Sequence, residues 1–116
     1  MTANLFAISN VTAMDDSREV FEEILTGGDG LVVERIVSNG QATPEGEWYD
    51  QDRDEWVVVL EGRARLAFDD GREIELGPGD HVFLPKRLKH RVTYTSRPCV
   101  WLAVFGNTLR RIYEKA

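Results

Sequence analysis

The sequence predicts an all-β domain, a sandwich or barrel of short strands, preceded by one short α-helix. Its 116 residues, 42% hydrophobic and 29% charged, suit one globular domain with a single core. After Gly30 the chain consists of β-branched and aromatic runs of four to eight residues, separated by Gly, Pro, Asn or Asp. Seven such runs at close spacing are typical of two packed sheets or a barrel.

The helix is predicted over about residues 16–25, within an N-terminal segment of residues 1–30. Asp16 and Glu19 have the spacing of a capping box. The apolar residues that follow share one helical face, and a glycine pair then ends the pattern. These apolar residues are Val20, Phe21, Ile24 and Leu25.

The strands are predicted within residues 31–105, followed by a tail at 106–116 in which 109–116 has the apolar spacing of a short helix. Asp69-Asp70-Gly71 marks a hairpin, because Gly adopts the positive φ that tight β-turns need. Residues 56–60 do not alternate, so a second sheet or a partner subunit should cover their outer face, and we expect a homodimer. The predicted strands are 31–37, 55–60, 63–68, 72–76, 81–84, 90–95 and 99–105.

Charge and cysteine content exclude several classes of function. The net charge is −6, which disfavours binding to nucleic acids or to anionic membrane surfaces. With one cysteine, Cys99, no intrachain disulfide can form, and we expect a buried, inert thiol. The sequence has neither the pattern of a signal peptide nor a long apolar run, so we expect a cytoplasmic protein.

The acidic segment at residues 48–55 resembles part of a calcium-binding EF-hand loop. Asp50, Asp52, Asp54 and Glu61 have the spacing of positions 1, 3, 5 and 12 of that loop. Position 6, which needs Gly, is Glu55, and the following positions are strand-like. Solvated loop carboxylates are therefore the favoured interpretation.

A different alignment of this segment resembles the two signature motifs of the cupin family. Glu55 and Gly62 match the Glu and final Gly of the first motif, and Gly79, Pro85 and His90 match the second motif at the family spacing. The resemblance covers about residues 31–105 and implies a cupin-like jelly-roll β-barrel. It also implies a polar pocket inside the barrel that serves a small-molecule ligand.

This sequence departs from the cupin motifs at several functional positions. Gln51 and Tyr49 stand where the first motif has its two histidines, and Tyr94 stands where the second motif has Asn. The resemblance therefore implies Gln51, Glu55 and His90 as ligands of a divalent metal such as Mn, Fe or Zn. Alternatively, the same three side chains bond to one another and to water in a metal-free pocket.

The resemblance leaves three functions open: an enzyme, a ligand-binding module without catalysis, and an interaction domain with a vestigial pocket. For an enzyme, Glu55 and His90 are the candidate catalytic residues. The basic segment at 86–91 could attract an anionic substrate, although a solvated loop is favoured. The candidate substrate-binding residues are Arg35, Trp48, Tyr49 and Tyr94.

Overall fold

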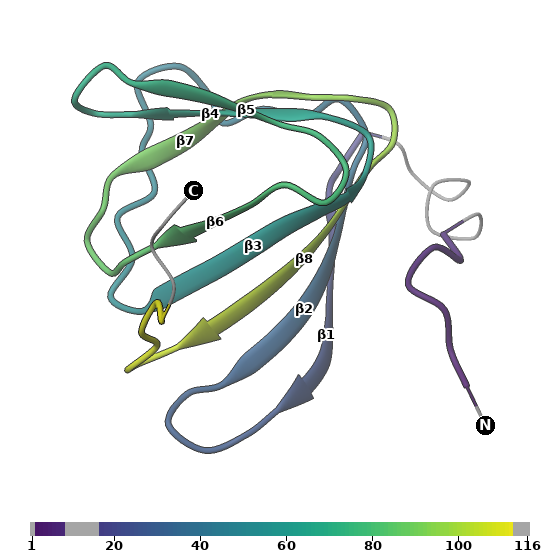
Figure 1. Cartoon of the computed structure of the whole chain (residues 1–116). Helices are drawn as coiled ribbons and strands as arrows, with labels where there is room; N and C mark the ends of the chain where they lie inside the picture. Colours follow the sequence, from purple (N-terminus) through teal and green to yellow (C-terminus); the bar gives the residue numbers. More distant parts are fainter. Residues whose placement is uncertain (1, 9–16, 113–116) are drawn as a thin grey trace.

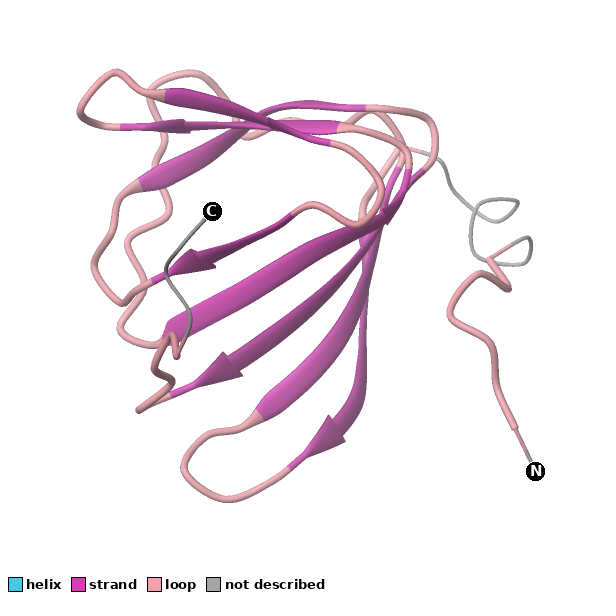
Figure 2. Cartoon of the chain, viewed as in Figure 1, coloured by secondary structure: helices cyan, strands magenta, loops and turns pink. Residues whose placement is uncertain are grey.

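The computed structural model describes residues 2–8 and 17–112, in which eight antiparallel strands and no helix are found (Figures 1 and 2). The all-β prediction is confirmed, and the seven predicted strands lie within two residues of the observed ones. The strands are β1 Val20–Thr26, β2 Val32–Ser38, β3 Asp54–Glu61, β4 Ala64–Phe68, β5 Glu73–Leu76, β6 His81–Leu84, β7 His90–Thr95 and β8 Cys99–Gly106.

The strands form two sheets that lie face to face, as in a jelly roll (Figure 1). One sheet has five strands in the order β1-β2-β8-β3-β6, and the other has three in the order β5-β4-β7. From β3 to β8 the chain crosses between the sheets at every step except β4 to β5, which form a hairpin within the small sheet. The two sheets remain separate, so the predicted barrel is not closed by hydrogen bonds.

The predicted N-terminal helix is wrong over the described residues, which form strand β1. Val20 pairs with Val37 and Phe21 with Ile36, so the segment adds an edge strand to the large sheet. A bulge between Glu23 and Leu25 interrupts the two-residue alternation. The resulting spacing imitates a helical face, and pairing with β2 supplies the backbone hydrogen bonds that a helix would have made internally. Asp16 lies outside the described residues.

Two other local predictions have different outcomes. The hairpin at Asp69-Asp70-Gly71 is confirmed: Gly71 has φ 93° and its amide donates to the Phe68 carbonyl. The C-terminal helix is not formed over residues 109–112, and the remainder of that prediction lies outside the described residues.

The core lies between the sheets and follows from the alternation of side chains along each strand. Val57 and Val59 of β3 point inward with Glu55, since residues two apart in a strand share a face. They meet Leu66 and Phe68 of β4 in one buried cluster. The same alternation that fills the core therefore places the Glu55 carboxyl between the sheets.

Gly62 connects β3 to β4 where no larger residue fits. Its φ is 88°, and a Cβ atom there would lie 2.4 Å from the carbonyl oxygen of Pro98. This close approach gives a physical reason for glycine at the end of the first motif, because the chain must turn sharply there to enter the second sheet.

Candidate functional site

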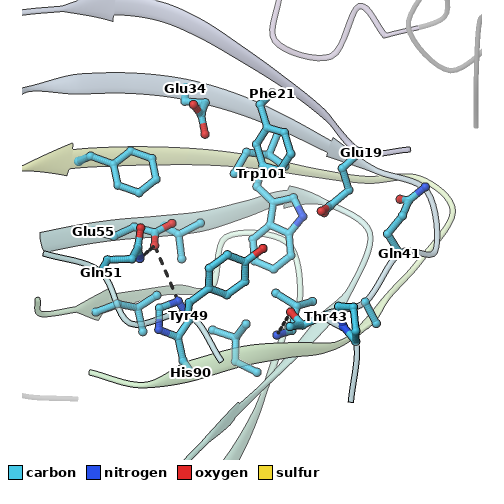
Figure 3. Close-up of a pocket in the computed structure, with 18 residues that line it drawn as sticks. Glu19, Phe21, Glu34, Gln41, Thr43, Tyr49, Gln51, Glu55, His90 and Trp101 are labelled. Carbon is cyan, nitrogen blue, oxygen red and sulfur yellow. Dashed lines mark hydrogen bonds and ion pairs between the residues drawn. The ribbon is translucent and has the colours of Figure 1, made fainter. Parts of the chain in front are cut away.

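A cavity of about 210 Å³ lies between the two sheets and is the candidate site (Figure 3). Both sheets and the segment that precedes β3 contribute to its wall. The lining combines three carboxylates and one imidazole with aromatic and aliphatic side chains. The polar and aromatic lining residues are Glu19, Phe21, Glu34, Gln41, Thr43, Tyr49, Gln51, Glu55, His90, Trp101 and Phe105.

Backbone pairing brings the segment at 49–51 beside β7. Tyr49 and His90 exchange two backbone hydrogen bonds, of 2.8 and 3.1 Å, across an isolated bridge. Their rings stack with centroids 5.4 Å apart. The carbonyl of Gln51 accepts a hydrogen bond from the Arg87 amide at 2.7 Å. These contacts hold Tyr49 and Gln51 against the loop that leads into His90.

The structure brings Gln51, Glu55 and His90 together at one end of the cavity (Figure 3). The Gln51 amide Nε2 donates a hydrogen bond to Glu55 Oε1 at 3.0 Å. His90 Nε2 lies 4.0 Å from the same oxygen, which is too long for a hydrogen bond. The imidazole and the carboxyl therefore both remain able to bond to a third molecule.

The orientation of the His90 ring is set by its other nitrogen. His90 Nδ1 lies 2.9 Å from the carbonyl oxygen of Leu88. Because a carbonyl oxygen only accepts hydrogen bonds, Nδ1 carries a proton. In the neutral imidazole, Nε2 is consequently the basic atom, and it faces Glu55.

Burial determines the acidity of the cavity carboxyls. Glu55 is only 8% exposed, and this burial raises its pKa, although the Gln51 hydrogen bond and the charges of His90 and Arg53 oppose the shift. Burial likewise raises the pKa of Glu34, against the effect of Arg53. Burial also raises the pKa of Tyr49, with the charge of Glu19 as the next cause. The cavity thus holds a carboxyl whose proton is retained to higher pH than in water.

The donor set does not fit a resident divalent metal ion. Within the described residues, no group of three or more His, Cys, Asp or Glu side chains converges on one point. Gln51 directs its amide nitrogen, not its oxygen, toward Glu55, so this amide satisfies the carboxylate instead of ligating a cation. One imidazole and one carboxyl supply only two ligands, fewer than the three or four protein ligands typical of sites for Mn, Fe or Zn.

Arg35 was predicted to bind substrate, but the structure places it on the outer face of the large sheet. It alternates with the cavity residues Glu34 and Ile36, so its side chain points the opposite way. Its guanidinium forms an ion pair with Glu22 and donates to the carbonyl of Leu5 at 2.9 Å. Arg35 therefore attaches the N-terminal segment and does not line the cavity.

Tyr94 and Trp48, also predicted to bind substrate, lie outside the cavity lining. Leu66 pairs with Val92 and Arg65 with Tyr94, so β7 carries an extra residue at a bulge. The bulge turns Tyr94 outward, where the Arg65 guanidinium lies 5.2 Å from its ring. Trp48 is 40% exposed, with the Arg91 guanidinium 5.9 Å from its ring.

The cavity also contains residues that the sequence reasoning missed. Glu34 shares the inward phase of Val32 and Ile36, and this charged residue on an apolar face was the available signal. Glu19 and Phe21 were hidden by the helix prediction, which assigned them to a different element. Trp101 is buried, and its ring belongs to both the core and the cavity wall.

The Lys and Arg side chains of the basic segment at 86–91 do not line the cavity. Lys86 Nζ donates to the Asn107 carbonyl at 2.7 Å, and Arg87 pairs with Asp50 at 3.4 Å. Arg91 donates to the Thr43 carbonyl at 3.1 Å. The partners of Lys86 and Arg87 are exposed, as expected for a solvated loop, whereas Thr43 is half-buried at the cavity wall.

Two further expectations from the sequence concern Cys99 and the membrane. Cys99 is buried, and burial raises the pKa of its thiol to about 12, so the expected inert thiol is confirmed. Within residues 2–8 and 17–112, no helix has the length and apolar character needed to cross a membrane.

Comparison with known proteins identifies the relatives of this chain. The family model described as Cupin domain matches residues 34–105. No curated protein sequence matches the chain. A solved structure described as a candidate mannose-6-phosphate isomerase, from Ralstonia eutropha JMP134, is similar at 40% identity and a TM-score of 0.82, over 93% of this chain and 99% of that one.

Two more distant structures share the fold. A cupin superfamily protein from Desulfitobacterium hafniense DCB-2 is 15% identical with a TM-score of 0.68, over 81% of this chain and 82% of that one. The DMSP lyase DddQ from Ruegeria pomeroyi DSS-3 is 24% identical with a TM-score of 0.66, over 81% of this chain and 49% of that one.

Proposed function

The chain belongs to the cupin domain family, and from this premise we propose that its cavity binds a small organic molecule with which Glu55 exchanges a proton. One observation carries the proposal. A buried carboxyl and an imidazole face each other across 4.0 Å at the wall of a cavity, too far apart to satisfy each other. Paired titratable groups in such a setting are typical of acid-base sites.

The chemistry assigns a separate task to each side chain. Ionised Glu55 removes a proton from a C–H bond that a neighbouring carbonyl acidifies, and it later returns that proton to carbon. Gln51 holds the Glu55 carboxyl in place through its 3.0 Å hydrogen bond. Protonated at Nε2, His90 donates a hydrogen bond to the oxygen on which negative charge develops. No external oxidant or metal is needed for this proton balance.

The names of related proteins support proton transfer as the reaction class of this chain. They do not support the substrates of those proteins as its substrates. One is described as a candidate isomerase and another as a lyase, and proton transfer at carbon is an elementary step in both classes. The phosphate of mannose 6-phosphate needs cationic partners. Neither Lys nor Arg is among the described residues that line this cavity, so a phosphosugar is disfavoured.

The proposal is tested by ligand screening followed by hydrogen exchange. Small carbonyl compounds, sugars and aromatic compounds are screened for a rise in melting temperature, and each that binds is incubated with the protein in D₂O. We expect NMR to show deuterium entering the ligand with wild-type protein, and the rate to fall about 10²-fold or more in Glu55→Gln.

The controls separate catalysis from binding alone. Glu73→Gln removes a carboxylate from an exposed position of β5 and should leave exchange unchanged. Binding without exchange in wild-type protein would overturn proton transfer and leave a ligand-binding module. If exchange proceeds equally in Glu55→Gln, Glu55 is not the base.

The donor set leads to a prediction about metals. Adding Mn²⁺, Fe²⁺ or Zn²⁺ should leave the melting temperature unchanged, whereas a true ligand at 100 times its Kd stabilises by about 2.7 kcal/mol. Gln51→His should increase metal affinity by adding an imidazole nitrogen. Elemental analysis of untagged protein tests this directly, and stoichiometric metal lost in His90→Ala would contradict the prediction.

We further propose that the chain forms a homodimer through the outer face of its large sheet. Val33 pairs with Val104 and Val104 with Trp56, and paired residues share a face of the sheet. Trp56 also pairs with Phe83, and Val58 with Leu102, which extends this face across β2, β8, β3 and β6. Arg35, which pairs with Leu102, interrupts this face with its ion pair to Glu22, and the apolar residues on β8, β3 and β6 favour packing against the same face of a second copy.

Light scattering coupled to size exclusion should therefore give about twice 13.2 kDa for the wild-type protein. Leu102→Glu places a charge in the middle of this face and should produce a monomer with an unchanged circular dichroism spectrum. A wild-type monomer at tens of micromolar would contradict the proposed interface.

A further inference from the structure

The charges that line the cavity favour a positively charged ligand. Glu19, Glu34 and Glu55 contribute carboxylates, and no Lys or Arg is among the described lining residues. An anion entering this cavity would lose its hydration, face three carboxyl groups and gain no Lys or Arg partner among the described lining residues. An organic cation would exchange its hydration for carboxylates held in a low-dielectric site.

The cavity lining also contains aromatic rings, which attract cations to their faces. Phe21, Tyr49, Trp101 and Phe105 all contribute to the lining. The faces of such rings attract ammonium groups, most strongly at Trp. Trp101 is buried, whereas Phe21 and Tyr49 are 55% and 42% exposed, so these two rings lie where the cavity meets solvent.

The cavity has two distinct ends (Figure 3). Gln51, Glu55 and His90 lie together at one end and Glu19 lies at the other, with Tyr49 and Trp101 between them. The Glu34 and Glu55 carboxyls already have a compensating cation, because Arg53 is among the charges that act on both. Arg53 itself lies over the Phe105 ring, 3.8 Å from its centroid.

Glu19 is held at its end of the cavity by a chain of hydrogen bonds. The Trp101 indole Nε1 donates to the Ser38 hydroxyl oxygen at 3.0 Å, and this hydroxyl in turn donates to Glu19 Oε2. The chain fixes the carboxylate relative to the indole ring. A preorganised carboxylate in a cavity that is also lined by aromatic rings provides a suitable binding position for an ammonium group.

We propose that the ligand is a small organic cation, a quaternary or protonated amine, whose positive group lies between Glu19 and the Trp101 and Tyr49 rings. The inference rests on the proposed function for the opposite end, where the remainder of the molecule meets Glu55 and His90. A molecule that occupies both ends therefore carries a cationic group for one end and a reactive group for the other.

The test compares two probes of the same shape and different charge. Choline carries a trimethylammonium group, and 3,3-dimethylbutan-1-ol is its neutral carbon analogue. Isothermal titration at fixed ionic strength should show choline binding about tenfold or more tightly than the alcohol, the range expected when a desolvated cation gains aromatic and carboxylate partners.

Glu19→Gln tests the position of the cationic group. It removes the charge while keeping an oxygen that accepts the Ser38 hydrogen bond, so the fold should be unaffected. We expect choline affinity to fall about fivefold or more and affinity for the alcohol to stay the same. Glu73→Gln, which changes the net charge of the protein equally at an exposed site, should leave both affinities unchanged.

The outcomes separate this inference from the proposed function. Equal affinities for the two probes, or no choline binding, would overturn the cationic ligand class, while deuterium exchange into another ligand would still support Glu55 as the base. An equal loss of choline affinity in Glu19→Gln and Glu73→Gln would overturn the assigned position. Preferential choline binding without exchange in any ligand would support the cation site and remove proton transfer.

Discussion

Replacing Glu55 by glutamine is expected to raise the free energy of unfolding at pH 8 by about 0.5 to 2 kcal/mol, the gain typical of relieving a strained functional site. Burial raises the pKa of this carboxyl above its value in the unfolded chain. A raised pKa means that the folded state binds the proton more tightly. Its stabilising contribution is therefore present below the unfolded value of about 4.5 and is lost as the pH rises through the folded pKa. Glutamine cannot ionise and avoids this loss.

Urea unfolding of both proteins at pH 5 and pH 8 measures the effect. The stability difference between Glu55→Gln and wild type should be larger at pH 8. Glu75→Gln, at an exposed position on β5, serves as the matched control and should show only a small difference at either pH. A difference that is larger at pH 5 would mean that the folded state favours the ionised Glu55 carboxylate.

Replacing Phe68 by alanine is expected to lower the free energy of unfolding by about 3 to 5 kcal/mol. Phe68 is 6% exposed and belongs to the buried cluster between the sheets. Removing its ring reduces the apolar surface that is buried on folding. It also leaves a void that the neighbouring strands cannot fill completely. Denaturant unfolding monitored by circular dichroism gives the change.

Two variants show whether burial is the cause. Ala67 lies on the same strand but on the outer face, where it pairs with Glu73 and Arg91. Ala67→Ser should therefore lower the free energy of unfolding by less than about 0.5 kcal/mol. Ile112→Ala also removes an apolar side chain, but Ile112 is 94% exposed, so stability should be unchanged. A small effect of Phe68→Ala, or a large one of Ala67→Ser, would show that the assigned faces of β4 are reversed.

Most strands could be predicted because their signals are local. In β4, Ala64, Leu66 and Phe68 alternate with polar or small residues, and the turn after them contains Gly at a positive φ. The grouping of Gln51, Glu55 and His90 followed from the spacing of the family motifs. Their hydrogen bonds, and hence the poor fit to a metal, could not be read from spacing, because they depend on side-chain orientation.

The N-terminal segment could not be predicted because its local signal was ambiguous. The two apolar pairs of β1 suit one face of a helix, and they also suit an edge strand that contains a bulge. Only the presence of β2, whose backbone accepts this pairing, decides between them. The misassignment also concealed Glu19 and Phe21, which form one end of the cavity.

The sequence by itself determined the predominantly β class, the positions of seven of the strands in the described residues and which residues of a strand share a face, since alternation is a local property of the extended backbone. Only the tertiary structure decided which face meets the other sheet. It placed Glu34 inside and Arg35 outside, and the bulge in β7 turned Tyr94 away from His90. These choices depend on pairing between segments distant in the chain. Periodicity within one strand carries no information about that pairing.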